Sequence, residues 1–387
     1  MKLFRRLNLA IGALALIWLS GVVLVARVTA QGQPTMTLVP GQNSGQAFKN
    51  VTTSTLKVLS PDDFIGAMGV ISAALGFDCA DCHPGAGSDD VNWVIDTPLK
   101  VTARRMVEMV ASINKTNFGG VQRVTCWTCH HGRVRPATSI QLDTLYDTPN
   151  TEVDDIVTAE PGQPTPDQVI DKYIQAIGGR QRLAGLNSFI ATGTSLGYFG
   201  LGGTAEFTIY AKSPSQRATT ISYKDHPERG TSAWVFDGKA GWTKTPRSLL
   251  GAYQTTGGEL EGFKLEAQLA FPIEIKSALT NWRVGGRRSI GSQDYVVLQG
   301  TGVGGFMATL YFHPETGLLT RVVRYGPSPV GRVVTQIDYA DYRDVSGIKF
   351  PFEQTFLWLD GRYTAKLSGV KTNVPIEASR FAKPAGQ

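Results

Sequence analysis

Two short motifs contain all four cysteines of the 387-residue chain: Cys79-Ala80-Asp81-Cys82-His83 and Cys126-Trp127-Thr128-Cys129-His130. The chain has only five histidines, and one of them directly follows each cysteine pair. Two thiols with this spacing can form thioether bonds to the two vinyl groups of one haem, and the adjacent histidine can bind the iron. The motifs therefore predict two covalently attached c-type haems. The predicted attachment residues are Cys79, Cys82, Cys126 and Cys129, and the predicted proximal ligands are His83 and His130.

Two other interpretations of the cysteines stay open. Four cysteines in an exported protein can form two disulfides. Two Cys-x-x-Cys-His units can also supply ligands to structural zinc. A histidine after both pairs favours haem over disulfides, and an oxidising compartment disfavours zinc.

The sixth iron ligands are sought among the remaining methionines and histidines. Met68 precedes the first motif, and Met106 and Met109 precede the second. Methionine on an apolar helix face often only fills a core, but here each motif follows such a methionine. We predict Met68 and Met106 as ligands, with Met109 as the alternative to Met106; a third candidate, His131, is better suited to a capping or propionate contact. A methionine ligand raises the reduction potential relative to a second histidine.

A helix is expected immediately before each motif. Ser60 suits the N-cap, Pro61 the first turn, and Gly76 the end of a helix carrying Phe64, Met68, Ile71 and Leu75 on one face. A second helix is expected from Pro98 to about Ile113, ended by Asn114 and the loop to Gly119-Gly120. The unit of a helix followed by a motif thus occurs twice.

The segment from about Leu56 to Pro136 resembles the cytochrome c subunit of bacterial photosynthetic reaction centres. The similarity rests on Leu59-Ser60-x-x-Asp63-Phe64-x-x-x-Met68, on Ala103-Arg104-x-Met106-x-x-Met109-Val110-x-x-Ile113-Asn114, and on Val124-Thr125-Cys126-x-Thr128-Cys129-His130-x-Gly132-Arg133. The resemblance implies Met–His ligation by Met68 with His83 and by Met106 with His130, and a basic position at Arg133 that meets propionates or an acidic partner. Full-length members carry four haems, whereas this chain has cysteines for two, which favours respiratory over photosynthetic electron transfer.

The N-terminus has the pattern of an export signal. Basic residues at Lys2, Arg5 and Arg6 precede an uncharged apolar run from Leu9 to Val25, and small residues precede Gln31. We expect residues 1–30 to be a cleaved signal peptide or a retained N-terminal anchor. The net charge is +6, of which the leader carries four positive charges, so the body gives no argument for nucleic acid as a partner.

The predicted organisation has three parts after the leader. Residues 31–140 form a mainly α-helical dihaem cytochrome domain, residues 141–164 an acidic, proline-containing linker, and residues 165–387 an antiparallel all-β half-barrel domain that opens with a helix. Alternation in Ala205–Tyr210 and short apolar runs from Tyr295 to Leu367, separated by turn residues, indicate the strands. His226 and His313 both precede proline and are expected in surface turns.

The β-rich half is similar to the half-barrels of periplasmic lipoprotein carriers. The similar residues are Ile174-x-x-Ile177-Gly178-Gly179, Trp234-x-Phe236-Asp237-Gly238 with Gly241-Trp242, and Tyr339-x-x-Tyr342-Arg343-Asp344-Val345-x-Gly347-Ile348-Lys349-Phe350-Pro351. The resemblance implies a concave face for a hydrophobic ligand. Packing or docking is the alternative role.

The predicted function is electron transfer rather than catalysis. We expect an exported carrier in the periplasm or on the outer face of the cytoplasmic membrane, exchanging electrons with redox proteins in or at the membrane. The alternatives are a haem enzyme such as a dihaem peroxidase, a gas-binding cytochrome with one open iron, and a hydrophobic-ligand or lipoprotein-binding protein with an accessory cytochrome domain.

Overall fold

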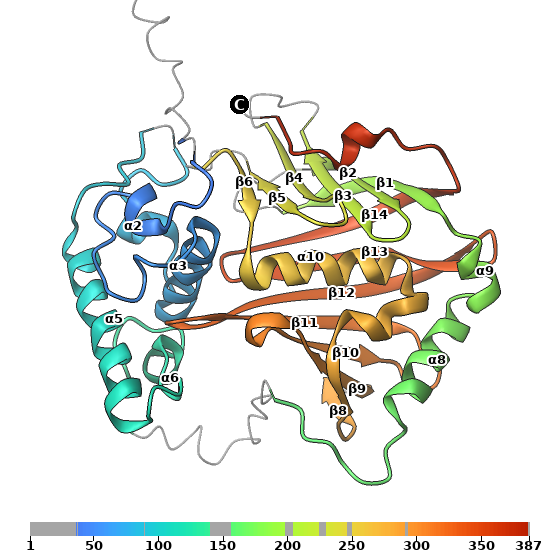
Figure 1. The fold of residues 1–387 in the computed structure, drawn as a ribbon, viewed down its shortest axis with the longest axis horizontal. Coiled ribbons are helices and arrows are strands. Elements are labelled where there is room, and N and C mark those ends of the chain that lie inside the picture. Colours follow the sequence, from blue (N-terminus) through green and yellow to red (C-terminus); the bar gives the residue numbers. More distant parts are fainter. Residues whose placement is uncertain are drawn as a thin grey trace, which may run out of the picture.

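The computed structural model describes residue 36 and residues 38–88, 90–139, 156–197, 204–223, 230–245, 250–290 and 293–385. The expected leader, most of the expected linker and His226 lie outside the described residues. Within them, no helix is both long enough and apolar enough to cross a membrane. A helical region and a large curled sheet lie side by side (Figure 1).

The helical region contains both cysteine motifs. Its helices are α2 (Ser44–Ala47), α3 (Pro61–Leu75), α4 (Cys79–Cys82), α5 (Pro98–Asn117) and α6 (Cys126–His130). The predicted ends of α3 are confirmed: the Ser60 hydroxyl accepts the Asp63 N–H, and Gly76 adopts the left-handed conformation that closes the helix. Gly76 also lies against the backbone carbonyl of Gly132, so α3 ends directly at the second motif.

Helix α5 continues one turn beyond its predicted end. Asn114 does not stop the helix but lies buried inside it. Its amide donates to the Val124 carbonyl at 2.7 Å, and its oxygen accepts the N–H groups of Arg123 and Val124 at 2.9 Å each. Asn114 therefore ties the segment that leads into Cys126 to α5.

The β-rich half forms one antiparallel 14-stranded sheet, which confirms the predicted strands. The sheet order is β6-β5-β4-β3-β2-β1-β14-β13-β12-β11-β10-β9-β7, with β8 paired to β9. The strands are β1 (Ser188–Leu196), β2 (Thr204–Lys212), β3 (Gln216–Ser222), β4 (Thr231–Phe236), β5 (Gly241–Lys244), β6 (Ala252–Thr255), β7 (Thr280–Val284), β8 (Arg288–Ile290), β9 (Gln293–Thr301), β10 (Met307–Phe312), β11 (Leu319–Ser328), β12 (Gly331–Val345), β13 (Ile348–Trp358) and β14 (Gly361–Thr372).

Helices fill most of the inner face of this sheet. They are α8 (Pro166–Ala176), α9 (Arg180–Ala184), α10 (Gly257–Ala270) and the 3-10 helix η2 (Pro272–Ala278), and two further 3-10 turns are η3 (Val303–Gly305) and η4 (Ala378–Phe381). The opening helix α8 is confirmed, with Thr165 as its N-cap. The sheet curls around α10 (Figure 1).

Helix α10 corrects the expectation of an all-β half-barrel. Two glycines let it approach the sheet closely, because a Cβ at Gly258 would lie 2.6 Å from Gly326 Cα and one at Gly262 would lie 1.7 Å from Arg324 Nη1. The main core then forms between the helices and the sheet, with Leu265, Leu298 and Leu310 fully buried. The inner face is therefore mostly packed rather than open.

The helical region packs on the ends of two strand pairs. Ala67, Val70 and Val107 form a second core with Val330 and Val333 of the β11–β12 hairpin, and Trp358 and Leu359 of the β13–β14 turn border it. The N–H of Cys126 donates to the Val330 carbonyl at 3.1 Å. The sheet thus supports the second motif directly and stands beside the first.

Part of the segment expected to be a linker packs on the outer face of the sheet. Val157 is 2% exposed and lies in a core with Val297, Met307 and Val323. Its N–H donates to Gln299 Oε1 at 3.1 Å. The division of the chain into domains stays a prediction.

Candidate functional site

The first motif is one helical turn fixed by a capping box. Asp78 Oδ1 accepts the N–H groups of Ala80 at 2.7 Å and Asp81 at 3.3 Å, and Asp81 Oδ2 accepts the Asp78 N–H at 2.8 Å. Residues three apart lie on the same side of a helical turn. The capping box therefore places the Cys79 and Cys82 thiols on one side of α4.

His83 follows this turn and is partly enclosed. Its ring lies 4.9 Å from that of Trp93, and its Nδ1 atom is buried and has no hydrogen-bond partner within the described part of the chain. Burial, together with the charge of Lys100, lowers the pKa of His83 to about 4. The imidazole is therefore neutral at pH 7, which is the form that binds a metal.

A large cavity, here called the junction cavity, adjoins the first motif. It has a volume of about 1210 Å³ and is lined by Cys79, Cys82, His83 and Met68 on the helical side. The sheet contributes Phe356, Trp358 and Asp360 from β13 and the turn after it. The structure thus brings Met68 to the same cavity as the first motif, and the sheet supplies one wall.

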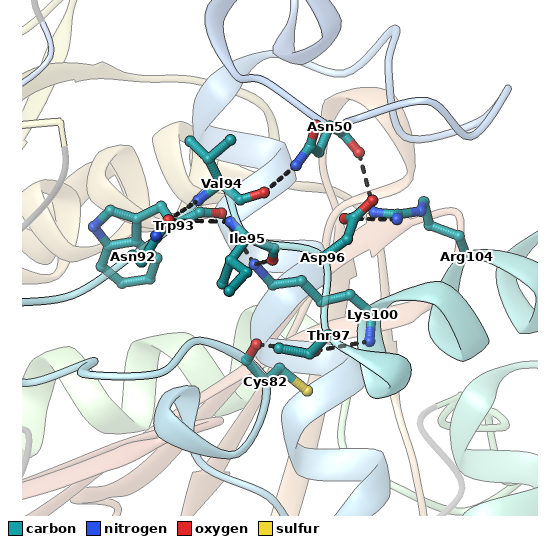
Figure 2. A network of polar contacts seen from close by, with 10 residues as sticks. All are labelled: Asn50, Cys82, Asn92, Trp93, Val94, Ile95, Asp96, Thr97, Lys100 and Arg104. Carbon is teal, nitrogen blue, oxygen red and sulfur yellow. Dashed lines mark hydrogen bonds and ion pairs between the residues drawn. The ribbon is translucent and has the colours of Figure 1, made fainter.

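A network of polar contacts holds the loop over this cavity (Figure 2). Lys100 Nζ on α5 donates to the carbonyls of Trp93 at 3.0 Å and Ile95 at 2.9 Å. Arg104 pairs with Asp96 at 2.7 Å and also donates to the Asn50 carbonyl. These bonds fix Trp93 against His83, and they place Lys100 and Arg104, two cations, at the cavity wall.

The second motif is a turn of the same design. Thr125 Oγ1 accepts the Thr128 N–H at 3.3 Å, and Thr128 Oγ1 accepts the Thr125 N–H at 3.0 Å. His130 Nδ1 lies 2.9 Å from the Arg133 carbonyl oxygen. A hydrogen bond at Nδ1 orients the ring and leaves Nε2 for a metal.

The surroundings of the second motif are open. Cys129 is exposed, Trp127 is 48% exposed and Val134 is 49% exposed. Met106 on α5 is half-buried, whereas Met109 is 44% exposed. His131 adopts a left-handed conformation at the end of α6 and bonds through Nε2 to the Thr128 carbonyl oxygen, which agrees with a capping role.

The two motifs lie in segments of opposite charge. Residues 77–96 contain five aspartates and no lysine or arginine, whereas residues 118–139 contain Arg123, Arg133 and Arg135 and no acid. Along the chain, the first motif is therefore flanked by acids and the second by arginines.

The residues present fit two covalently attached haems. All four cysteines are free thiols, both pairs lie on capped helical turns, and the junction cavity offers space beside a neutral histidine. Burial, with the nearby charges of Asp360 and Asp78, raises the pKa of Cys79, and burial raises that of Cys126 to about 11. Both thiols are therefore protonated at pH 7 in the chain without a bound group.

Several cavity residues were not expected from the sequence. Trp93, Lys100 and Asp360 were given no site role, and Arg104 entered only as part of the cytochrome resemblance. Burial raises the pKa of Asp360 to about 6. The sequence signal for Asp360 was that it is a charged residue next to the turn residue Gly361. Its position near Cys79 depends on the packing of two segments that are far apart in the sequence.

Asp62, at the start of α3, is a buried acid that also lines the junction cavity. It is 7% exposed and accepts the Thr256 N–H at 2.7 Å. Burial, with the charges of Glu259 and Asp63 adding to it, raises the pKa of Asp62 well above its ordinary value. The folded protein therefore holds this proton at pH values where the unfolded chain, with a pKa of about 3.9, has lost it.

Replacing Asp62 by asparagine should stabilise the protein increasingly as pH rises. The stabilising contribution of the raised pKa is complete below about pH 4 and is lost as pH rises through the folded-state pKa. The introduced amide keeps an acceptor oxygen for the Thr256 N–H and cannot ionise, so we expect variant and parent to be equally stable near pH 4 and the variant to be more stable at pH 8. Urea unfolding at several pH values measures this, with the exposed Asp171→Asn as control. A constant difference at all pH values would contradict the expectation.

The helical region is similar in sequence to a known family of proteins. Residues 25–167 match the family described as photosynthetic reaction centre cytochrome C subunit. The photosynthetic reaction center cytochrome c subunit of Rubrivivax gelatinosus is 32% identical over 120 residues, which are 29% of this chain and 31% of that protein. The chain thus spans about a third of the length of this curated relative. These matches confirm the resemblance indicated by the motifs.

Solved structures resemble more than half of the chain. A LolA superfamily protein from Nitrosomonas europaea matches 57% of this chain and 99% of its own at 17% identity, with a TM-score of 0.38. A putative outer membrane lipoprotein-sorting protein domain from Vibrio parahaemolyticus matches 55% of this chain and 97% of its own at 12% identity, also with a TM-score of 0.38.

Proposed function

We propose that this chain is an exported dihaem c-type cytochrome that transfers electrons between redox proteins in or at the membrane. The observation that carries the proposal is the convergence of Met68 and the first Cys-x-x-Cys-His turn on one cavity. Each haem, when bound, supplies a one-electron redox couple. The chain would supply the attachment residues, the ligands and, at the first motif, an enclosing cavity.

The residues proposed to hold the two haems are those that the motifs indicate. Cys79 and Cys82 would attach the first, with His83 and Met68 as ligands and Lys100 and Arg104 as cations for its propionates. Cys126 and Cys129 would attach the second, with His130 and Met106 as ligands. Met109 is the weaker candidate for this ligand. Its side chain is exposed, so water could reach the same position on the iron.

In an electron carrier, each iron would have two protein ligands. The alternatives, a haem enzyme or a gas-binding cytochrome, need one iron that has only a histidine ligand and can bind a substrate or gas. Met68 at the junction cavity favours the closed arrangement. Because the chain has cysteines for two haems only, we propose a respiratory rather than photosynthetic setting. A coulometric titration tests the carrier function: we expect two electrons per chain, and one or none would contradict it.

We further propose that the second haem exchanges electrons with an acidic redox partner. The second motif carries the exposed residues Trp127 and Cys129 and has Arg133 and Arg135 next to it in the chain, whereas the first adjoins the junction cavity and follows Asp78. Complementary charge speeds the encounter of two proteins and is screened by salt.

Arg133→Glu combined with Arg135→Glu should slow reduction by a small acidic ferredoxin at least tenfold at low ionic strength. Near 1 M salt, where the Debye length is about 3 Å, the difference should nearly vanish. Stopped-flow rates measure this. The control reverses two exposed sheet lysines, Lys349→Glu with Lys371→Glu. An equal loss of rate in this control would show that only net charge matters and would contradict a docking role for the second motif.

A further inference from the structure

A small polar pocket, here called the inner pocket, lies between the inner face of the sheet and α10. Its volume is about 40 Å³, and Thr219, Arg324 and Glu266 contribute to its lining. It shares Trp234, Glu259 and Phe356 with the junction cavity. The inner pocket is thus a recess lined by both charged and aromatic side chains, and it adjoins a mainly apolar space.

The charges around the inner pocket balance. Arg324 is 3% exposed and pairs with Glu259 at 3.0 Å and with Glu266 at 3.3 Å, and Arg217 pairs with Glu266 at 2.9 Å. Two cations and two anions leave no net charge for a charged ligand to neutralise. Since a buried charge without a partner is costly, this recess favours a neutral ligand.

Two hydrogen-bonding groups in the recess have no partner among the residues that the structure describes. Arg324 Nε and Thr219 Oγ1 are both buried and unbonded. Buried polar atoms are nearly always hydrogen-bonded, and an unmade bond is costly. An N–H and an O–H at one recess can both donate to a single acceptor oxygen, which a carbonyl group supplies.

Aromatic rings extend from the recess toward the junction cavity. The ring of Tyr363 stacks on Phe356 at 5.1 Å with 12° between the planes, and on Trp234 at 6.3 Å with 27°. Such a wall suits a flat ligand that stacks in offset geometry. The junction cavity, at about 1210 Å³, exceeds the roughly 300–1,000 Å³ of a site for one drug-sized ligand. The inner pocket adjoins its sheet-side wall through the shared residues Trp234, Glu259 and Phe356.

We propose that the inner pocket and the adjoining part of the junction cavity bind a neutral quinone, whose carbonyl oxygen accepts hydrogen bonds from Arg324 and Thr219. The ring lies along Trp234, Tyr363 and Phe356. The recess offers no unpaired cation to the headgroup of an anionic lipid, because Arg324 and Arg217 are already paired with Glu259 and Glu266. Binding itself needs only the sheet and α10; its place beside the first haem rests on the proposed function.

Equilibrium dialysis of the full-length protein with duroquinone tests this proposal. This fully substituted quinone does not alkylate thiols. We expect one molecule per chain, and we expect Thr219→Val, which removes one hydroxyl at nearly constant volume, to weaken binding about threefold to tenfold, as the loss of one hydrogen bond predicts. The matched control is Thr335→Val. Thr335 is also a buried strand threonine with an unpartnered hydroxyl, but it does not line the inner pocket.

The outcomes separate this proposal from the haem proposal. Unchanged affinity in Thr219→Val, equal loss in Thr335→Val, or palmitate binding as tightly as duroquinone would each overturn the quinone site. Circular dichroism of both variants establishes that they fold. If the protein bound duroquinone but contained no haem, the quinone site would stand and the proposed function would be overturned. If it contained haem but did not bind duroquinone, the proposed function would stand and the quinone site would be overturned.

Discussion

Replacing Cys79 and Cys82 together by serine is expected to reduce the haem content from two per chain to one. Each Cys-x-x-Cys-His turn lies on its own capped helix, and each forms an independent attachment point. Without thioether bonds, a haem is held only by its iron ligands and is lost during purification. The pyridine haemochrome assay with the mass of the intact chain measures this.

The second motif supplies the matched variant. Cys126→Ser with Cys129→Ser should also leave one haem, and the quadruple variant none. A double variant that retains two covalently attached haems would show that its motif is not an attachment site. Since serine is close in size to cysteine, the helical content should change little, and far-ultraviolet circular dichroism checks this.

Met68→Leu is expected to open the sixth position of one haem and leave the other unchanged. Leucine conserves the volume of methionine but has no sulfur, so packing costs below about 1.5 kcal/mol while the ligand is lost. About half of the haem should then become high-spin and shift its spectrum with carbon monoxide, and the reduction potential of that haem should fall. Optical titration of the two haems measures both effects.

The controls for this prediction are methionines elsewhere in the chain. Met307→Leu changes a buried methionine of the sheet and should leave both haems unaltered. Met106→Leu should open the second haem, and Met109→Leu should not; the opposite pattern would assign Met109 as the ligand. If Met68→Leu left both haems low-spin, Met68 would not be the ligand of the first haem.

Local chemistry made the elements of this fold predictable. Ser60, Pro61 and Gly76 specify both ends of α3 through capping groups and a left-handed residue, which act within a few positions of the chain. Strands β9 to β14 were predictable from apolar runs between turn residues. Helix α10 was missed because glycines at 257, 258 and 262 disfavour a helix, although Leu260 and Phe263 at helical spacing were a signal for it.

The attachment residues were predictable, but the cavity around them was not. A Cys-x-x-Cys-His turn is short and chemically specific, so the sequence alone indicates it. The junction cavity combines α3 with Trp234, Phe356 and Asp360, which are more than 150 residues away from it. Such contacts depend on how the sheet curls and where α10 lies, and no local sequence pattern specifies either of these.

The optical spectrum of the purified protein, with its haem-to-protein ratio, distinguishes a dihaem electron carrier from a haem enzyme and from a protein without haem. We predict two haems per chain, a weak near-infrared band from methionine–iron charge transfer in the oxidised form, and no spectral change with carbon monoxide in the reduced form. A carbon monoxide shift in the unaltered protein would indicate an open iron and contradict the carrier. The absence of haem from protein matured by a cell that attaches c-type haem would contradict the account as a whole.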